Sequence, residues 1–215
     1  MELYLDSVNL NEINQAVDLG IIAGVTTTPT FMHREGIEDV DSAIKELSKK
    51  VKVLQIEALG RTAEEIINEA LRLEEYLKLN RKSTVYKIPI SLEGVKACKH
   101  LTSLGFLINL HLVYTVQQAY LAMEAGATYV CPLVGRLQDQ GGDGVGLVRS
   151  CVEVIDTYNY DTKVMFSSVR TPQHVKEALK AGAHTITVPW HILNSLATHH
   201  LTSVHTEQFY EHANR

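Results

Sequence analysis

Short runs of β-branched and apolar residues recur along the chain at intervals of roughly 27 residues, about the length of one strand and one helix. Each run is short enough to form a single strand. The eight runs are ELYLD, AGVTTTP, VLQIEAL, TVYKIPI, FLINLHLVY, TYVCPLV, KVMFSSV and TITVPW. The pattern therefore predicts eight strands.

The stretches between these runs are amphipathic. In TAEEIINEALRLEEYLK, residues 62–78, apolar side chains recur at helical spacing on one face, while the charged side chains lie mostly elsewhere. The apolar residues of this face are Ile66, Ala70, Leu73 and Leu77. We therefore expect a helix between successive strands.

Several predicted helices run into a glycine just before the next strand. Gly105, Gly126 and Gly182 occupy this place. Glycine ends a helix readily because it adopts the left-handed conformation at low steric cost. The glycines thus predict the same boundaries as the apolar pattern.

Strands that alternate with helices imply a parallel sheet. Eight such units with apolar side chains on both strand faces favour an α/β fold closed into a (β/α)8 TIM barrel. An open doubly wound sheet is the alternative. We expect residues 1–215 to form one domain. Within it, about residues 203–215 would form a C-terminal helix, anchored by Phe209 and able to pack on a neighbouring subunit.

The composition is that of an ordinary globular protein, with 45% apolar and 21% charged residues in 215. A net charge of -5 provides no broad cationic face for a nucleic acid. The start, MELYLDSVNL, lacks the features of a signal peptide, and no window approaches the roughly 18 apolar residues of a membrane span. We expect a cytoplasmic protein with neither nucleic acid nor membrane as a partner.

The potential metal ligands are poorly arranged for a metal site. Cys98, Cys131 and Cys151 are odd in number and lack the close pairing of a zinc or redox motif, so we expect buried thiols. The ten histidines are scattered, and the adjacent His199 and His200 cannot share one helix face. No metal and no cofactor are predicted.

Three charged residues fall on predicted strands. In a barrel, polar residues at the carboxyl ends of strands converge on one rim, where such enzymes keep their active sites. Asp6 ends the first run, Glu57 lies in the third and Lys87 lies inside the fourth. An amine enclosed by valine, tyrosine and isoleucine is costly to keep charged, which favours the neutral form that attacks carbonyl groups.

Each of these residues also has a purely structural interpretation. Lys87 can extend its charged end into solvent. Asp6 can cap the helix that begins near Asn9, and Glu57 can be a solvated carboxylate at a strand end.

Five ordered motifs resemble the transaldolase and fructose-6-phosphate aldolase family over nearly the whole chain. They are LYLDS, AGVTTTPT, VYKIPIS, AGATYVCPLVGR and SSVRTP. The resemblance implies a metal-independent class I enzyme in which Lys87 forms a Schiff base with a ketose. It also implies that Asp6 moves the hydroxyl proton that drives carbon–carbon cleavage, and that Glu57 acts through a water during Schiff-base formation.

The resemblance further implies the residues that bind substrate. Arg136, Ser168 and Arg170 are assigned to the anionic group, for which the planar guanidinium fork is suited. Surface ion pairing is the structural alternative for the two arginines. The remaining assigned residues are Thr26, Thr28 and Asn109.

Three positions depart from the family pattern. Thr28 replaces an asparagine, His111 a threonine and Leu133 an aromatic residue. His111 could hold the catalytic water, transfer protons near neutral pH, or fill interior space. Leu133 cannot donate a proton, which favours transfer over simple cleavage.

The segment QGGDGVG lacks the lysine and hydroxyl of a phosphate-binding loop and is predicted to be a flexible loop.

The leading hypothesis is transfer of a dihydroxyacetone unit from a ketose phosphate resembling fructose 6-phosphate to an aldose phosphate. The alternatives are a transaldolase acting on 6-deoxy-6-sulfofructose, a fructose-6-phosphate aldolase, and a barrel that binds sugar phosphates without catalysis. By resemblance we expect a homo-oligomer, either a pentamer or a decamer.

Overall fold

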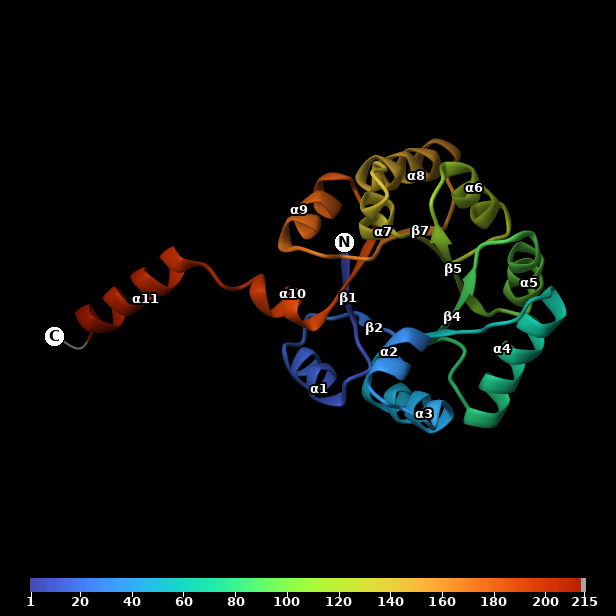
Figure 1. The fold of residues 1–215 in the computed structure, drawn as a ribbon, viewed down its shortest axis with the longest axis horizontal. Helices are drawn as coiled ribbons and strands as arrows, with labels where there is room; N and C mark the ends of the chain where they lie inside the picture. Colours follow the sequence, from blue (N-terminus) through green and yellow to red (C-terminus); the bar gives the residue numbers. More distant parts are fainter. Residues whose placement is uncertain (214–215) are drawn as a thin grey trace.

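The computed structural model describes residues 1–213 and contains eight parallel strands closed into a barrel, ordered along the chain from β1 to β8. Helices surround this ring (Figure 1). The strands are β1 (Glu2–Asp6), β2 (Gly24–Thr26), β3 (Leu54–Glu57), β4 (Thr84–Pro89), β5 (Leu107–Val113), β6 (Tyr129–Pro132), β7 (Lys163–Phe166) and β8 (Thr185–Val188). Each predicted run contains one strand, so the (β/α)8 barrel is confirmed and the open sheet is excluded.

The helices form where the amphipathic pattern predicts them, with additional short helices in the loops. They are α1 (Leu10–Asp18), α2 (Pro29–Arg34), α3 (Val40–Lys50), α4 (Ala63–Leu77), α5 (Leu92–Ser103), α6 (Val116–Glu124), α7 (Val134–Asp139), α8 (Gly144–Tyr158), α9 (Pro172–Lys180), α10 (Trp190–Ser195) and α11 (His200–Ala213). In α4, the Thr62 side chain caps the first turn by accepting from Glu65 N. All four predicted apolar residues of α4 are buried.

Glycine conformations follow the prediction at the helix ends but not in QGGDGVG. Gly105, Gly126 and Gly182 all have positive φ. The prediction of a flexible loop is wrong for Gly144 to Gly146, which form the first turn of α8. Asp143 caps that turn by accepting from Gly146 N at 2.8 Å, and a side chain at Gly144 would meet Val134 O at 2.7 Å.

The core has two parts. A large outer layer fills the space between strands and helices. A smaller cluster, including Tyr4, Val85, Tyr129 and Met165, fills the barrel interior, where the hydroxyls of Tyr4 and Tyr129 lie 3.1 Å apart. Because side chains alternate between the two strand faces, this packed layer closes the barrel below the carboxyl ends of its strands.

The C-terminal helix α11 extends away from the barrel (Figure 1). It begins at His200, earlier than predicted, and residues 214–215 of the predicted helix lie outside the described residues. None of its residues is buried, and Phe209 is 71% exposed. The prediction that Phe209 anchors the helix is therefore wrong within a single chain.

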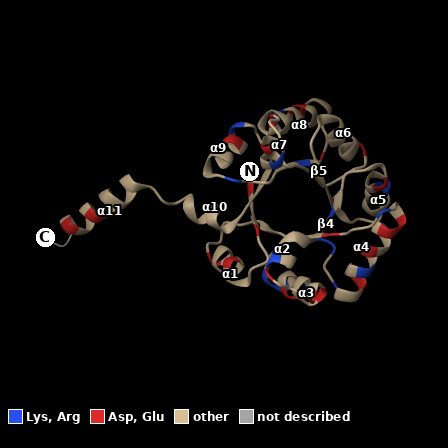
Figure 2. Cartoon of the chain, in the orientation of Figure 1, with Lys and Arg blue, Asp and Glu red and all other residues tan. Residues whose placement is uncertain are grey.

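The charged residues lie mainly on the outer helices, and α11 carries acidic residues without lysine or arginine (Figure 2). Among residues 1–213, no helix combines the length and apolar character needed to cross a membrane. Cys98, Cys131 and Cys151 are buried free thiols, as predicted.

Candidate active site

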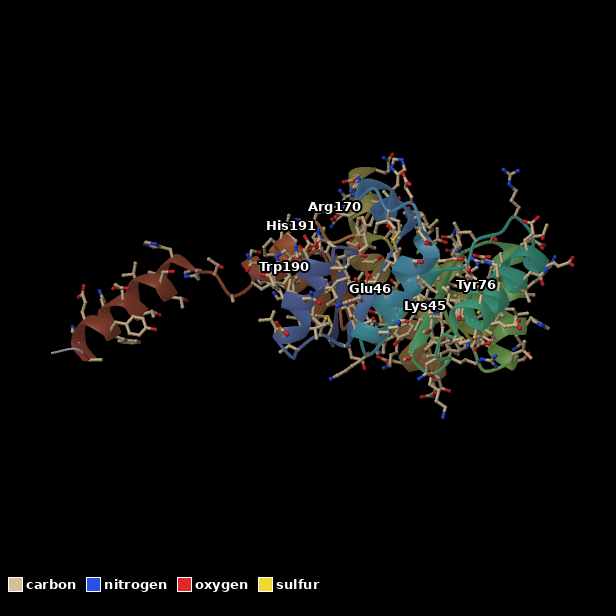
Figure 3. All side chains as sticks on the ribbon, turned by 90° about the horizontal axis from the view of Figure 1, so that it is seen from below. Lys45, Glu46, Tyr76, Arg170, Trp190 and His191 are labelled. Carbon is tan, nitrogen blue, oxygen red and sulfur yellow. The ribbon has the colours of Figure 1, made fainter. Side chains whose placement is uncertain are left out.

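A cavity of about 620 Å³ opens at the carboxyl ends of the strands. Its lining includes Asp6, Glu57, Lys87, His111, Arg136 and Arg170. In the side view of Figure 3, Arg170, Trp190 and His191 lie at one edge of the barrel, near the point where the chain leaves toward α11. The cavity therefore occupies the rim on which barrel enzymes carry out their chemistry.

Lys87 lies inside the barrel. Its side chain is 6% exposed, and Nζ donates to Glu57 Oε1 at 2.8 Å and to the backbone oxygen of Thr27 at 2.7 Å. Strand pairing sets this geometry, because Glu57 and Lys87 are register partners on β3 and β4. The alternatives of a solvent-directed Lys87 and a solvated Glu57 are therefore wrong.

His111 reaches the second oxygen of the same carboxylate. His111 Nε2 lies 2.9 Å from Glu57 Oε2, and both atoms are buried with no other hydrogen-bond partner among the described residues. Burial is the largest single effect and raises the pKa of Glu57, but the Lys87 ammonium, the neighbouring His111 and the hydrogen bond from Lys87 together lower it to about 2. Burial lowers the pKa of His111 despite the nearby carboxylate, so the ring is neutral near pH 7.

Asp6 lies across the barrel mouth at the end of β1. Its Oδ1 accepts a hydrogen bond from Thr26 Oγ1 at 2.7 Å, and Thr187 Oγ1 lies 2.6 Å from the Thr26 hydroxyl. Burial raises the pKa of Asp6, although the charge of Lys87 and the Thr26 bond act in the opposite direction. The side chain of Asn9, not Asp6, caps α1, so the capping interpretation of Asp6 is wrong.

Thr187 was missed by the sequence reasoning. An ionised Asp6 can only accept, so the single Thr26 proton goes to Asp6 and Thr187 must donate to Thr26. The signal was present in TITVPW, because strand alternation directs Thr187 and Thr185 to the same face. Thr187 lines the cavity and is buried.

Two predicted substrate residues have other contacts in the structure. Thr28 lines the cavity, but its hydroxyl also caps α2 by accepting from Phe31 N at 3.2 Å. Asn109 is fully buried, is absent from the cavity lining and donates to Gln55 Oε1 at 2.7 Å. On β5 it lies one inward position before His111, and so deeper in the barrel.

The three predicted anion ligands lie on two neighbouring loops. Arg136 is on the short helix α7, while Ser168 and Arg170 follow β7. Gly135 lets the loops meet, because a Cβ there would lie 2.1 Å from Ser168 O and 2.9 Å from Arg170 Nε. Arg170 does form a surface ion pair, with Asp139 at 2.9 Å, but both side chains are more than half exposed and such a pair contributes little stability.

Comparison with known proteins gives a consistent result. Residues 3–215 match the family described as Transaldolase/Fructose-6-phosphate aldolase. The chain is 41% identical to a probable transaldolase 2 of Bacillus cereus, with 97% of this chain and 96% of the relative covered. It is 42% identical to a probable transaldolase of Desulforudis audaxviator, with 97% and 95% covered.

A likeness to a solved structure concerns the fold alone. Thiamine phosphate pyrophosphorylase from Pyrococcus furiosus superposes with a TM-score of 0.56 at 17% identity, covering 87% of this chain and 85% of that chain. The barrel, its rim cavity and the relatives together define an enzyme of the (β/α)8-barrel class. The chain belongs to the transaldolase and fructose-6-phosphate aldolase family.

Proposed function

We propose that the protein transfers a dihydroxyacetone unit from a phosphorylated ketose to an aldose phosphate through a Schiff base on Lys87. The observation that carries this proposal is the contact of Lys87 Nζ with Glu57 Oε1 at 2.8 Å, inside a cavity that also exposes Asp6 and His111. Membership of the family supports the reaction class. The substrates and the covalent step are our proposal.

In the first step, the Lys87 nitrogen attacks the ketone carbon and a carbinolamine forms. Two acceptors, Thr27 O and Glu57 Oε1, receive hydrogen bonds from Nζ. The ammonium must first lose a proton, and the resulting amine has two N–H bonds for these two acceptors and a lone pair for the attack. Loss of water then gives the iminium, with proton movement supported by Glu57 and His111, whose facing atoms have no other hydrogen-bond partner among the described residues.

In the second step, Asp6 removes the proton from the hydroxyl on the carbon beyond the bond that breaks. The electron pair of that bond moves into the iminium and forms an enamine, and an aldehyde phosphate leaves. The enamine then attacks the carbonyl carbon of the acceptor, and the new alkoxide takes the proton back from Asp6. Water hydrolyses the resulting iminium and regenerates Lys87.

The surroundings of Asp6 suit this double role. Its pKa is raised by burial, so the carboxylate is a stronger base than that of an ordinary aspartate when it removes the hydroxyl proton. The acid then keeps this proton until the new alkoxide, a much stronger base, takes it back. Leu133 also lines the cavity and has no proton to give. Protonation of the enamine, which would release free dihydroxyacetone, is therefore slow in the absence of an acceptor.

Arg136, Ser168 and Arg170 are proposed to bind the phosphate. The guanidinium groups supply charge and paired donors, and Ser168 supplies a hydroxyl beside them. All three line the same cavity as Lys87. Thr26 and Thr28, on the opposite side of the barrel mouth, are left for the sugar hydroxyls.

Product analysis tests the function. Fructose 6-phosphate and 6-deoxy-6-sulfofructose are each supplied with and without glyceraldehyde 3-phosphate. We expect a new ketose phosphate only when both fructose 6-phosphate and acceptor are present. Free dihydroxyacetone formed without acceptor would indicate an aldolase. Transfer from 6-deoxy-6-sulfofructose but not from fructose 6-phosphate would indicate a transaldolase for sulfonated sugars. Binding without any product would indicate a non-catalytic barrel.

We also propose a homo-oligomer, a pentamer or a decamer, in which α11 packs on a neighbouring subunit. Support comes from the lack of any buried residue in α11 and from exposed Leu201, Phe209 and Tyr210 along it. Such apolar surface on an isolated helix is costly in water. Light scattering at micromolar concentration should give a multiple of 24.0 kDa, and a monomeric mass would contradict the assembly.

A further inference from the structure

The segment between β7 and α9 carries two of the proposed anion ligands and is held firmly at its start. Ser167 Oγ donates to Pro132 O at 2.8 Å, and Val134 N donates to Ser167 O at 3.1 Å. The next residue, Ser168, has a φ of 59°, a left-handed conformation that residues with a side chain seldom adopt. Such a conformation persists only when surrounding contacts hold it.

His174 supplies the contact at the other end of this segment. Its Nδ1 accepts a hydrogen bond from the backbone N–H of Arg170 at 3.1 Å. The side chain is 7% exposed, and its ring packs against Phe166 with centroids 5.9 Å apart. One imidazole therefore connects the first turn of α9, the last residue of β7 and the anion-binding segment.

This hydrogen bond requires an unprotonated Nδ1. Burial lowers the pKa of His174 and outweighs the opposite effect of the Glu177 carboxylate, while the Arg170 guanidinium acts in the same direction as burial. The ring is therefore neutral near pH 7 and can accept.

We propose that His174 is a positioning residue, which holds Ser168 and Arg170 in the conformation that binds the anionic group of the substrate. His174 is absent from the cavity lining, so it acts through the Arg170 backbone and not by touching substrate. The inference rests on the proposed role of Ser168 and Arg170 as anion ligands. A role confined to starting α9 is the competing explanation, because His174 lies in the first helical turn.

Three variants of His174 separate these explanations. His174→Leu keeps an apolar group against Phe166 but removes the acceptor. His174→Asn restores an acceptor, because its Oδ1 is attached to the same carbon as Nδ1. His174→Gln is the matched control, since its amide oxygen lies one bond further out, near the place of Nε2.

The measurement is steady-state transfer with fructose 6-phosphate and glyceraldehyde 3-phosphate. We expect His174→Leu and His174→Gln to raise KM for fructose 6-phosphate about five-fold or more, with kcat within about two-fold of wild type. His174→Asn should restore KM. Borohydride trapping of dihydroxyacetone, which has no anionic group, should be equally efficient in all four proteins.

The outcomes distinguish this inference from the proposed function. If wild type prefers fructose 6-phosphate over dihydroxyacetone and His174→Leu keeps the same KM, only the role of His174 is overturned. A loss of thermal stability in His174→Leu with unchanged KM would assign it to helix α9 alone. Equal KM in the Asn and Leu variants also contradicts the proposal. A wild type that does not favour the phosphorylated ketose overturns the anion site and the positioning role together.

Discussion

Lys87 and Glu57 are paired across neighbouring strands, with Nζ 2.8 Å from Oε1 and side chains only 6% and 8% exposed. Removing two charges from water costs several kcal/mol per ion, and a buried pair often adds little net stability. The pair is therefore poorly explained as a stabilising device. It is better explained by chemistry that needs an amine and a carboxylate in contact, away from bulk water.

Replacing Asp6 should separate activity from stability. Asp6→Asn keeps an oxygen that accepts from Thr26, but it cannot take a proton, so we expect kcat to fall by about 100-fold or more. Because burial raises the pKa of Asp6, ionisation disfavours the folded state.

The sign of the pH dependence for Asp6 follows from that raised pKa. Below the ordinary aspartate pKa of about 3.9 the group is protonated in both states, and its contribution to stability is lost as pH rises through the folded-state value. Asp6→Asn should thus unfold at an equal or higher denaturant concentration than wild type at pH 7, with the difference vanishing near pH 4 and below. Lower stability of Asp6→Asn at pH 7 would contradict the assigned sign.

His111 should contribute to proton transfer beside Glu57. We expect His111→Thr to retain part of the transferase activity, because a hydroxyl can hold water there, and His111→Ala to lose much more. In wild type, protonation of His111 should add to the fall of kcat/KM on the acidic side of the ordinary imidazole pKa of about 6.5, and His111→Thr should keep only the acidic limb that belongs to Asp6. Equal steady-state rates for wild type and His111→Ala would remove His111 from the mechanism.

Thr187 should act on Asp6 through Thr26. In Thr187→Val the Thr26 hydroxyl loses its donor and becomes a weaker donor to Asp6, which raises the pKa of Asp6 further. The acidic limb of kcat/KM that belongs to Asp6 should move to higher pH, and kcat/KM at neutral pH should fall about two- to ten-fold. Thr187→Ser keeps the hydroxyl and should behave as wild type, and an identical pH profile in the valine variant would exclude this chain of hydroxyls.

Gly135 should control the spacing of the anion ligands. A methyl group there would lie 2.1 Å from Ser168 O, so Gly135→Ala must push the two loops apart. We expect KM for the phosphorylated ketose to rise about ten-fold or more, while borohydride trapping of dihydroxyacetone stays as efficient as in wild type.

Gly105→Ala is the control for this variant. Gly105 has a φ of 83° with nothing within 4 Å of the added methyl group. It should lose roughly 1 kcal/mol of stability without a change in KM. If both variants change KM equally, the effect of Gly135 is a general loss of stability.

The sequence predicted the barrel because eight apolar runs and the glycines at helix ends are local signals. It also indicated Lys87, since a charge inside TVYKIPI is conspicuous on its own. The contact of Lys87 with Glu57 depends on strand register, which no local pattern contains. The same holds for Thr187. Its contact with Thr26 depends on the pairing of β8 with β1, which brings the two hydroxyls together.

Errors in the prediction have equally specific causes. The glycines of QGGDGVG suggested a loop, but Asp143 caps a helix there and close packing on Val134 requires Gly144. The assignment of Asn109 to the substrate stays a prediction, and alternation on β5 places Asn109 deeper than His111. Phe209 was given an anchoring role that a single chain does not provide, because its side chain is 71% exposed and no described residue of α11 is buried.

Borohydride reduction in the presence of fructose 6-phosphate, read by peptide mass spectrometry, tests the covalent role of Lys87 most directly. Lys87→Met removes the amine, whereas Lys163→Met removes a surface lysine paired with Glu2 and serves as the control. We expect an adduct on Lys87 in wild type and in Lys163→Met, and none in Lys87→Met. Transferase activity without any adduct, or an adduct on another lysine in Lys87→Met that retains activity, would contradict the account.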